Sequence, residues 1–138
     1  MKKLCLVLLA AALLLSACVS KSGSAPLVGD WKLTAYGPVD SPQEAVPGIE
    51  AILTFEVRDR VSGNLVCNQF GGGYKIKGDQ ITFDEMASTL MACSEPQMQQ
   101  EQAAFTIMAG SANYKIESST LTITKDNQVL FFEAVAGD

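Results

Sequence analysis

The sequence predicts an α+β, mostly β fold: a strongly bent antiparallel sheet or small barrel of about eight strands with one packed helix. Three observations lead to this prediction. Short segments in which apolar and polar residues alternate recur along most of the chain, and turn signals separate them. One segment of helical character interrupts the series after residue 94. The length of 138 residues suits a single domain with one core.

The first strands follow from this alternation. Trp31 and Leu33 give one apolar face to a strand predicted over Gly29–Leu33, and a second strand is predicted over Ala51–Val57. The stretch between them, Gly37–Gly48, contains three prolines and is predicted to be a loop.

A run of three glycines marks the middle of the chain. Residues 58–60 predict a turn into a strand over Val61–Cys67, and Gly71–Gly73 follows it. The residues that follow argue against a phosphate-binding loop, because Tyr74 and Lys75 stand where Lys and Ser or Thr would be needed and a strand is predicted next. The run is therefore interpreted as a bulge or turn at which two backbone segments pass closely.

The second half of the chain repeats the strand pattern. A hairpin turn is predicted at Lys77–Gln80, because Gly78 tolerates the positive φ of a tight turn. The strands predicted in this half are Tyr74–Ile76, Ile81–Phe83, Tyr114–Ile116, Leu121–Ile123 and Val129–Phe132.

One helix is predicted between Ser94 and Gly110. Ser94 suits the N-cap, Gln97 stands at the capping-box position, and Gly110 is a suitable stop. Met98, Gln102, Phe105 and Ala109 mark one face of this helix, and Ile107 and Met108 widen the apolar surface towards its end.

The N-terminus has the pattern of an export signal. Two lysines precede the apolar run Leu4–Leu15, which is too short for the usual membrane-spanning helix of roughly 20 residues. Leu15-Ser16-Ala17-Cys18 resembles a bacterial lipobox. We therefore predict a lipoprotein signal peptide over residues 1–17 and acyl chains such as palmitate on Cys18. The alternative is an ordinary secretory signal with an incidental cysteine.

The predicted organisation of the rest follows from composition. Residues 18–26 are small and polar and are interpreted as the acylated N-terminus and a flexible tether, and residues 27–138 as the folded domain. The predicted location is the bacterial cell envelope. Val19 rather than an aspartate follows the cysteine, so in a Gram-negative envelope the sorting pattern of lipoproteins indicates the outer membrane, facing the periplasm.

Four cysteines divide into two groups. Cys5 leaves with the signal peptide and Cys18 carries lipid, which leaves Cys67 and Cys93 in a compartment that permits disulfides. A disulfide between these two is the preferred interpretation. A metal-binding pair and a reactive thiol remain the alternatives.

Composition argues against several functions. The net charge is −5 without a basic cluster, which disfavours nucleic-acid binding. The chain contains no histidine, and no nucleophile–base pair is evident. Asp84 and Glu85 are adjacent and are expected to point apart rather than bracket a substrate. The methionines at 86, 91, 98 and 108 are interpreted as core filling rather than as a copper site.

Two cysteine motifs carry a family resemblance. The pattern C-N-x-F-x-G-x-Y, followed by T-x-M-A-C, resembles the META domain family, which includes HslJ-type heat-shock lipoproteins. Val66 replaces the glycine that often precedes the first cysteine of this family, and Glu101 and Phe105 fit its helix. The matching residues are Cys67, Asn68, Phe70, Gly72, Tyr74, Thr89, Met91, Ala92 and Cys93.

The resemblance implies a barrel-like sheet and supplies no catalytic residues. We predict a non-enzymatic envelope lipoprotein without a cofactor, monomeric, which binds a protein partner or supports the envelope under stress. The alternative is a carrier that holds a lipid or other apolar ligand inside the barrel. The surfaces least committed to packing are Gly37–Gly48 and Gly71–Gly73, which makes them candidate contact sites.

Overall fold

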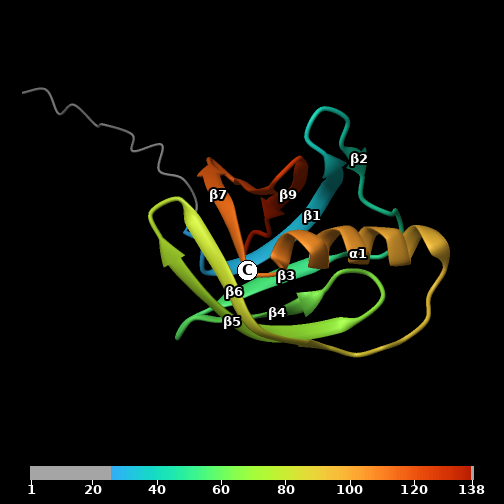
Figure 1. The fold of residues 1–138 in the computed structure, drawn as a ribbon, viewed down its shortest axis with the longest axis horizontal. Coiled ribbons are helices and arrows are strands. Elements are labelled where there is room, and N and C mark those ends of the chain that lie inside the picture. Colours follow the sequence, from blue (N-terminus) through green and yellow to red (C-terminus); the bar gives the residue numbers. More distant parts are fainter. Residues whose placement is uncertain (1–25, 138) are drawn as a thin grey trace, which may run out of the picture.

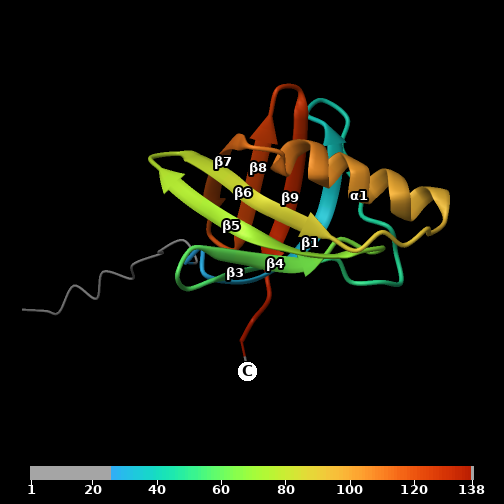
Figure 2. The same ribbon diagram turned by 60° about the horizontal axis from the view of Figure 1, so that its bottom comes forward.

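The computed structural model describes residues 26–137, so the predictions for residues 1–25, Cys18 included, lie outside the described part of the chain. The described residues form nine strands and one helix (Figures 1 and 2). These elements are β1 (Gly29–Pro38), β2 (Gln43–Glu44), β3 (Ile52–Glu56), β4 (Arg60–Asn64), β5 (Gln69–Lys77), β6 (Gln80–Ser88), α1 (Glu95–Met108), β7 (Ser111–Glu117), β8 (Thr120–Lys125) and β9 (Gln128–Ala134).

Eight of the strands close into an antiparallel barrel. Neighbours in sequence pair with each other from β3 to β9, and β1 closes the barrel because it pairs with β3 along one edge and with β9 along the other. The short strand β2 is added to β1. The helix α1 connects β6 to β7 and packs against β1, β7, β8 and β9. The predicted fold class is therefore confirmed.

The interior of the barrel is filled by its own side chains. Alternate residues of most strands point inward and join one continuous apolar cluster, to which α1 contributes Ala104, Ile107 and Met108. Phe55 and Tyr74 pack edge to face with ring centroids 4.9 Å apart. The largest fully buried side chains on strands include Trp31, Leu53, Phe55, Ile81, Leu121, Ile123, Leu130 and Phe132.

Two of the predicted boundaries were wrong near the first loop and strand β4. β1 continues to Pro38, and β2 lies within the predicted loop. The strand predicted over Val61–Cys67 ends at Asn64, whose side-chain Oδ1 accepts a hydrogen bond from Val66 N–H at 2.6 Å. Val66 then adopts a φ of 101°, a left-handed conformation that favours the glycine it replaces. Apolar residues continued past this turn, so alternation alone did not reveal it.

The three glycines lie inside β5 rather than between two strands. Gly71 pairs with Ala87 and Gly73 with Asp84, so β6 contains one extra residue at this place, a β-bulge at which Glu85 has a φ of 51°. A Cβ atom on Gly72 would lie 2.5 Å from the Met86 sulfur and 2.8 Å from the Asp84 carbonyl oxygen. The prediction of a bulge with close backbone approach is confirmed, whereas a turn at this position was wrong.

The helix begins as predicted, but only part of the predicted apolar surface is buried. The side chain of Gln97 accepts hydrogen bonds from Ser94 N–H at 3.2 Å and from Ser94 Oγ at 2.9 Å. Met98, Gln102 and Ala109 of the predicted face are exposed. The buried residues are Gln100, Glu101, Ala104, Ile107 and Met108, of which only the last two belong to the predicted apolar surface. Two polar residues stand on this face, so an apolar pattern could not identify it.

The glycine contacts generate a stability prediction. We expect Gly72→Ala to destabilise the fold by about 1–3 kcal/mol, because the new methyl group would overlap the backbone of the neighbouring strand. Gly71→Ala is the matched control. Its Cβ would meet only the Val61 carbonyl oxygen, at 3.7 Å, so it should change the unfolding free energy by less than about 1 kcal/mol. Urea unfolding measures both, and equal effects of the two substitutions would contradict the close approach at Gly72.

Candidate binding groove between β6 and α1

Asn68 is the centre of a hydrogen-bonded network that joins three separate segments. Its side-chain Oδ1 accepts bonds from Thr89 Oγ1 at 2.8 Å and from Met91 N–H at 2.7 Å. Its Nδ2 donates to Glu101 Oε1 at 2.6 Å, and its backbone N–H donates to Glu101 Oε2, also at 2.6 Å. One buried amide therefore connects the turn before β5, the segment after β6 and the helix.

The buried polar face of α1 explains why this helix lies where it does. Glu101 uses both carboxyl oxygens on Asn68. The neighbouring Gln100 is fully buried; its Oε1 accepts from Val46 N–H at 2.7 Å and its Nε2 donates to the Leu65 carbonyl at 3.3 Å. Buried backbone groups in irregular segments need such partners, because no strand satisfies them. The helix thereby fixes two loops in addition to covering the core.

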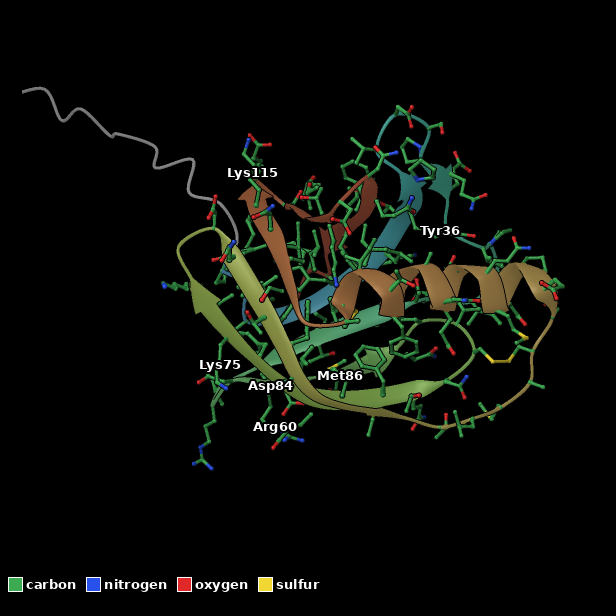
Figure 3. The ribbon with its side chains drawn as sticks, in the orientation of Figure 1. Tyr36, Arg60, Lys75, Asp84, Met86 and Lys115 are labelled. Atoms are coloured by element: carbon green, nitrogen blue, oxygen red, sulfur yellow. A yellow bond between two sulfur atoms is a disulfide. The ribbon has the colours of Figure 1, made fainter. Side chains whose placement is uncertain are left out.

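The segment after β6 is also held covalently. Cys67 and Cys93 form a disulfide with an S–S distance of 2.07 Å and a Cα–Cα distance of 5.9 Å. The bond lies beside the N-terminal end of α1 (Figure 3). Residues 89–93 are thus tied at Thr89, Met91 and Cys93, and this segment forms a fixed wall next to the helix.

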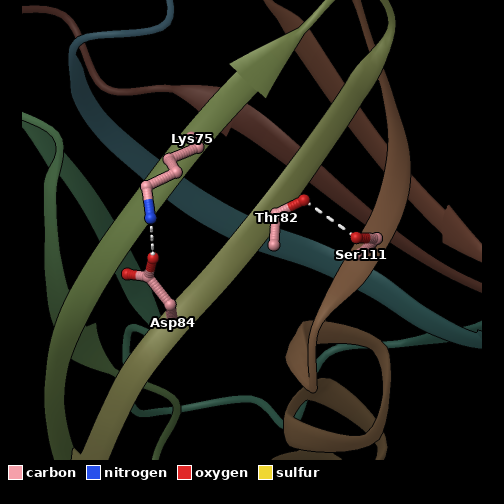
Figure 4. A network of polar contacts seen from close by, with 4 residues as sticks. All are labelled: Lys75, Thr82, Asp84 and Ser111. Carbon is pink, nitrogen blue, oxygen red and sulfur yellow. Dashed lines mark hydrogen bonds and ion pairs between the residues drawn. The ribbon is translucent and has the colours of Figure 1, made fainter.

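Strand β6 leaves its neighbour β7 early. Their pairing covers only Gln80, Ile81 and Thr82, and it ends where Thr82 Oγ1 and Ser111 Oγ lie 2.8 Å apart (Figure 4). One further bond follows, from Phe83 N–H to the Gly110 carbonyl at 2.9 Å. From Asp84 to Ser88, β6 pairs with β5 on one side and faces α1, not a strand, on the other.

A continuous groove occupies the space between this part of β6 and α1. It consists of two adjoining depressions of about 410 and 470 Å³, which share Ser88, Phe105 and Ala109. Leu90 is 96 % exposed, Met91 56 % and Met98 44 %, although all three are large and apolar. The groove therefore combines a backbone edge with exposed apolar side chains.

The electrostatic character of the groove is acidic. No lysine or arginine occurs between Lys77 and Lys115, whereas Glu85 at the bulge and Glu101 on α1 line the groove. Lys75 pairs with Asp84 across the outer side of β5 and β6 at 2.6 Å, away from α1 (Figures 3 and 4). This hydrogen bond to Asp84 raises the pKa of Lys75. Lys125 donates to the Ala109 carbonyl at the end of the helix.

The structure brings most of the residues of the two predicted motifs together. Cys67, Cys93, Asn68, Thr89 and Met91 meet in the disulfide and its adjoining network. The remaining motif residues lie apart from that network. Phe70 packs edge to face on Phe105, with ring centroids 5.6 Å apart, and Gly72 leaves room for the bulge in β6. Tyr74 belongs to the core, and Ala92 is exposed.

Some of the site was misjudged from the sequence. Core filling is correct for Met108 and for the half-buried Met86, but Met91 and Met98 are exposed and line the groove. Gly71–Gly73 belongs to the barrel wall, so it is not a free contact loop. The groove itself was missed, because it depends on where β6 departs from β7, and no local pattern encodes this separation.

Two further searches of the described residues bear on the site. Residues 26–137 contain no group of three or more Cys, Asp or Glu side chains arranged to hold a metal ion. Within the same range, α1 is neither long nor apolar enough to cross a membrane.

Comparison with known proteins identifies the family. A family model described as the META domain matches residues 25–136. The chain belongs to the META domain family. No curated protein matches this META domain in sequence.

Solved structures share its fold. An NMR structure of a protein from Burkholderia xenovorans is 22 % identical, with a TM-score of 0.66, over 79 % of this chain and 83 % of that one. A second NMR structure is 21 % identical, with a TM-score of 0.60, over 77 % and 88 %. A crystal structure of a lipocalin-like protein from Bacteroides uniformis is 15 % identical, with a TM-score of 0.54, over 79 % and 98 %. These likenesses show the barrel fold alone.

The disulfide yields a prediction about stability. The bond closes a loop with a sequence separation of 26, for which the chain-entropy estimate is about 3.5 kcal/mol. Reduction, or the double substitution Cys67→Ala and Cys93→Ala, should lower the melting temperature by roughly 10–20 °C. Thermal unfolding followed by circular dichroism with and without reductant measures this. An unchanged melting temperature, or two free thiols by alkylation without reductant, would contradict the pairing.

The Asn68–Glu101 contact yields a second prediction. Glu101→Gln replaces one acceptor by a donor that faces N–H groups of Asn68, so we expect a destabilisation of about 1–3 kcal/mol. Glu95→Gln is the matched control, since Glu95 lies exposed on the same helix and should change stability by less than about 0.5 kcal/mol. Chemical denaturation of both variants provides the test. A Glu101→Gln variant as stable as the control would refute a structural role for the pair.

Proposed function

We propose that this META domain is a non-enzymatic module of the bacterial envelope, anchored by acyl chains on Cys18, which binds a protein partner through the groove between β6 and α1. The observation that carries the proposal is the exposure of Leu90 and Met91 on a wall held by a disulfide and by the Asn68 network. Apolar side chains that are exposed together on a fixed surface typically mark interaction sites.

The fixed wall matters for the energetics of binding. A flexible loop loses conformational entropy when it binds, whereas a segment already ordered by Cys93 and Asn68 loses little. The Leu90 side chain is almost fully exposed and therefore adds little to the packing of the barrel core. The fold thus holds an apolar side chain in a fixed position without burying it, as expected if a partner covers Leu90.

The packing of the barrel favours surface binding over a carrier role. The interior positions are occupied by one cluster of large side chains, including Trp31, Phe55 and Phe132. A lipid inside the barrel would have to displace several of them, and each fully buried side chain of this kind contributes about 1.5–3 kcal/mol to stability. The groove, in contrast, is open without rearrangement.

The position of the chain start is compatible with an anchored module. Trp31 Nε1 donates to the Leu27 carbonyl at 2.7 Å, which places the start of the domain at the N-terminal end of β1. The first half of α1 lies towards the other end of β1. There the segment after β2 is bonded to the helix by the hydrogen bond from Val46 N–H to Gln100 Oε1. With Cys18 eight residues before Pro26, the tether spans at most about 30 Å. We expect the groove to face away from the anchor.

Site-specific photocrosslinking in living cells tests this proposal. A photoreactive residue at position 90 of the full-length protein should yield a defined crosslinked protein, and one at position 39, in the loop between β1 and β2, a weaker one. Position 57 is the control, because Val57 is 70 % exposed in the turn between β3 and β4, away from the groove. It should yield no adduct.

The anchor provides the second arm of the test. Cys18→Ser should abolish acyl labelling and release the protein from the membrane, and the crosslink at position 90 should decrease with it. Equal adducts at all three positions, or co-purification of a lipid without any protein adduct, would contradict the proposal and favour the carrier role.

A further inference from the structure

We propose that the groove receives an extended peptide segment of its partner, with apolar side chains alternating with lysine or arginine, which pairs as an additional strand with the β6 edge at Met86–Ser88. This inference rests on the proposed function, since it specifies the chemistry of the protein partner. It adds three features that the structure supplies: a free backbone edge, an apolar wall of suitable length and an excess of negative charge.

Backbone N–H and C=O groups of β6 point into the groove, where an added strand would pair with them. Phe83 N–H points to Gly110, away from β5, whereas Thr89 N–H donates to the Gln69 carbonyl on the β5 side at 3.0 Å. Alternation along the strand, with one extra residue at the Glu85 bulge, then directs the backbone groups of Met86 and Ser88 away from β5. They face the groove, and among the described residues no strand pairs with them.

The opposite wall of the groove suits the side chains of an added strand. Phe105 and Met108 of α1 line it, Met86 faces the groove from β6, and Leu90, Met91 and Met98 continue the apolar surface beyond Ser88. The free part of β6 is five residues long, from Asp84 to Ser88, or about 17 Å at the rise of a β-strand. Strand addition to an exposed sheet edge obtains affinity from backbone bonds and specificity from such alternating contacts.

The charge distribution selects a cationic segment. The groove carries Glu85 and Glu101, because the Asp84 carboxylate pairs with Lys75 on the outer side of the sheet, and none of the lining residues is basic. The carboxyl end of α1 also lines it at Met108 and Ala109, and the last turn of this helix has no basic residue to offset the negative end of its dipole. Lys125 from β8 satisfies one carbonyl, at Ala109. An anionic membrane surface or an acidic peptide would be repelled from this groove.

A fluorescently labelled peptide tests the proposal on the full-length lipidated protein in nanodiscs of zwitterionic phosphatidylcholine. The probe is a ten-residue peptide of alternating lysine with valine or leucine. Two comparison peptides have glutamate in place of lysine, or N-methyl groups on the backbone amides that would pair. By fluorescence anisotropy we expect saturable binding of the first peptide and at least tenfold weaker binding of the other two.

Variants of the protein locate the site. Leu90→Lys should weaken binding of the cationic peptide at least tenfold by adding like charge and removing apolar contact. Val57→Lys, at a position that is also exposed but lies outside the groove, should change binding less than twofold. Ser88→Pro removes a backbone N–H that faces the groove and makes no hydrogen bond with β5. This substitution should also weaken binding at least tenfold. Circular dichroism of each variant establishes that it is folded.

The outcomes separate this inference from the proposed function. Equal binding of the N-methylated peptide would overturn strand pairing, and equal binding of the acidic peptide would overturn the charge selection. Absence of binding by every peptide, while the crosslink at position 90 persists in cells, would overturn the inference and leave the proposed function standing. Loss of both would overturn both.

Discussion

The contact between Asn68 and Glu101 is the interaction on which the irregular half of the domain depends. The barrel ladder satisfies its own backbone groups, but the turn at residues 65–68 and the segment at 89–93 lie outside it. The Asn68 side-chain oxygen accepts hydrogen bonds from Met91 N–H and from the Thr89 hydroxyl. Both carboxyl oxygens of Glu101 accept hydrogen bonds from N–H groups of Asn68. Because Glu101 stands on α1, the position of the helix, the path of the segment after β6 and the wall of the groove are fixed together.

A second constraint comes from the barrel wall. The bulge at Glu85 requires β5 to pass very close to β6, and only a residue without a side chain fits at Gly72. A bulge increases the local twist of a strand. β6 turns away from β7 in the same region, after Thr82, and α1 occupies the side that β7 leaves. The free edge is thus a product of the same geometry that closes the barrel, and it requires no disorder in either strand.

Local signals in the sequence sufficed for the strands and for the helix start, since these depend on alternation and on the pairing of Ser94 with Gln97. They failed where burial is polar or where apolar residues continue through a turn. Gln100 and Glu101 look like surface residues until their partners, Val46 and Asn68, are known. Leu65 to Cys67 look like strand, and only the Asn64 side chain bonded to Val66 N–H marks the end. The groove required knowledge of strand pairing, which is not local.

An exposed strand edge that is free to bind is also free to bind a second copy of the same chain, which is a general hazard of β-sheets. The free edge of β6 carries its own protection. Glu85 sits in a bulge with a left-handed backbone, which interrupts the regular spacing that a long flat strand would need. Two copies of this edge would also bring Glu85 of each chain close to that of the other, and like charges on facing strands are destabilising. The charge that disfavours self-association is the one that favours a segment rich in lysine or arginine, so a single feature accounts for both the restraint and the selectivity of the edge.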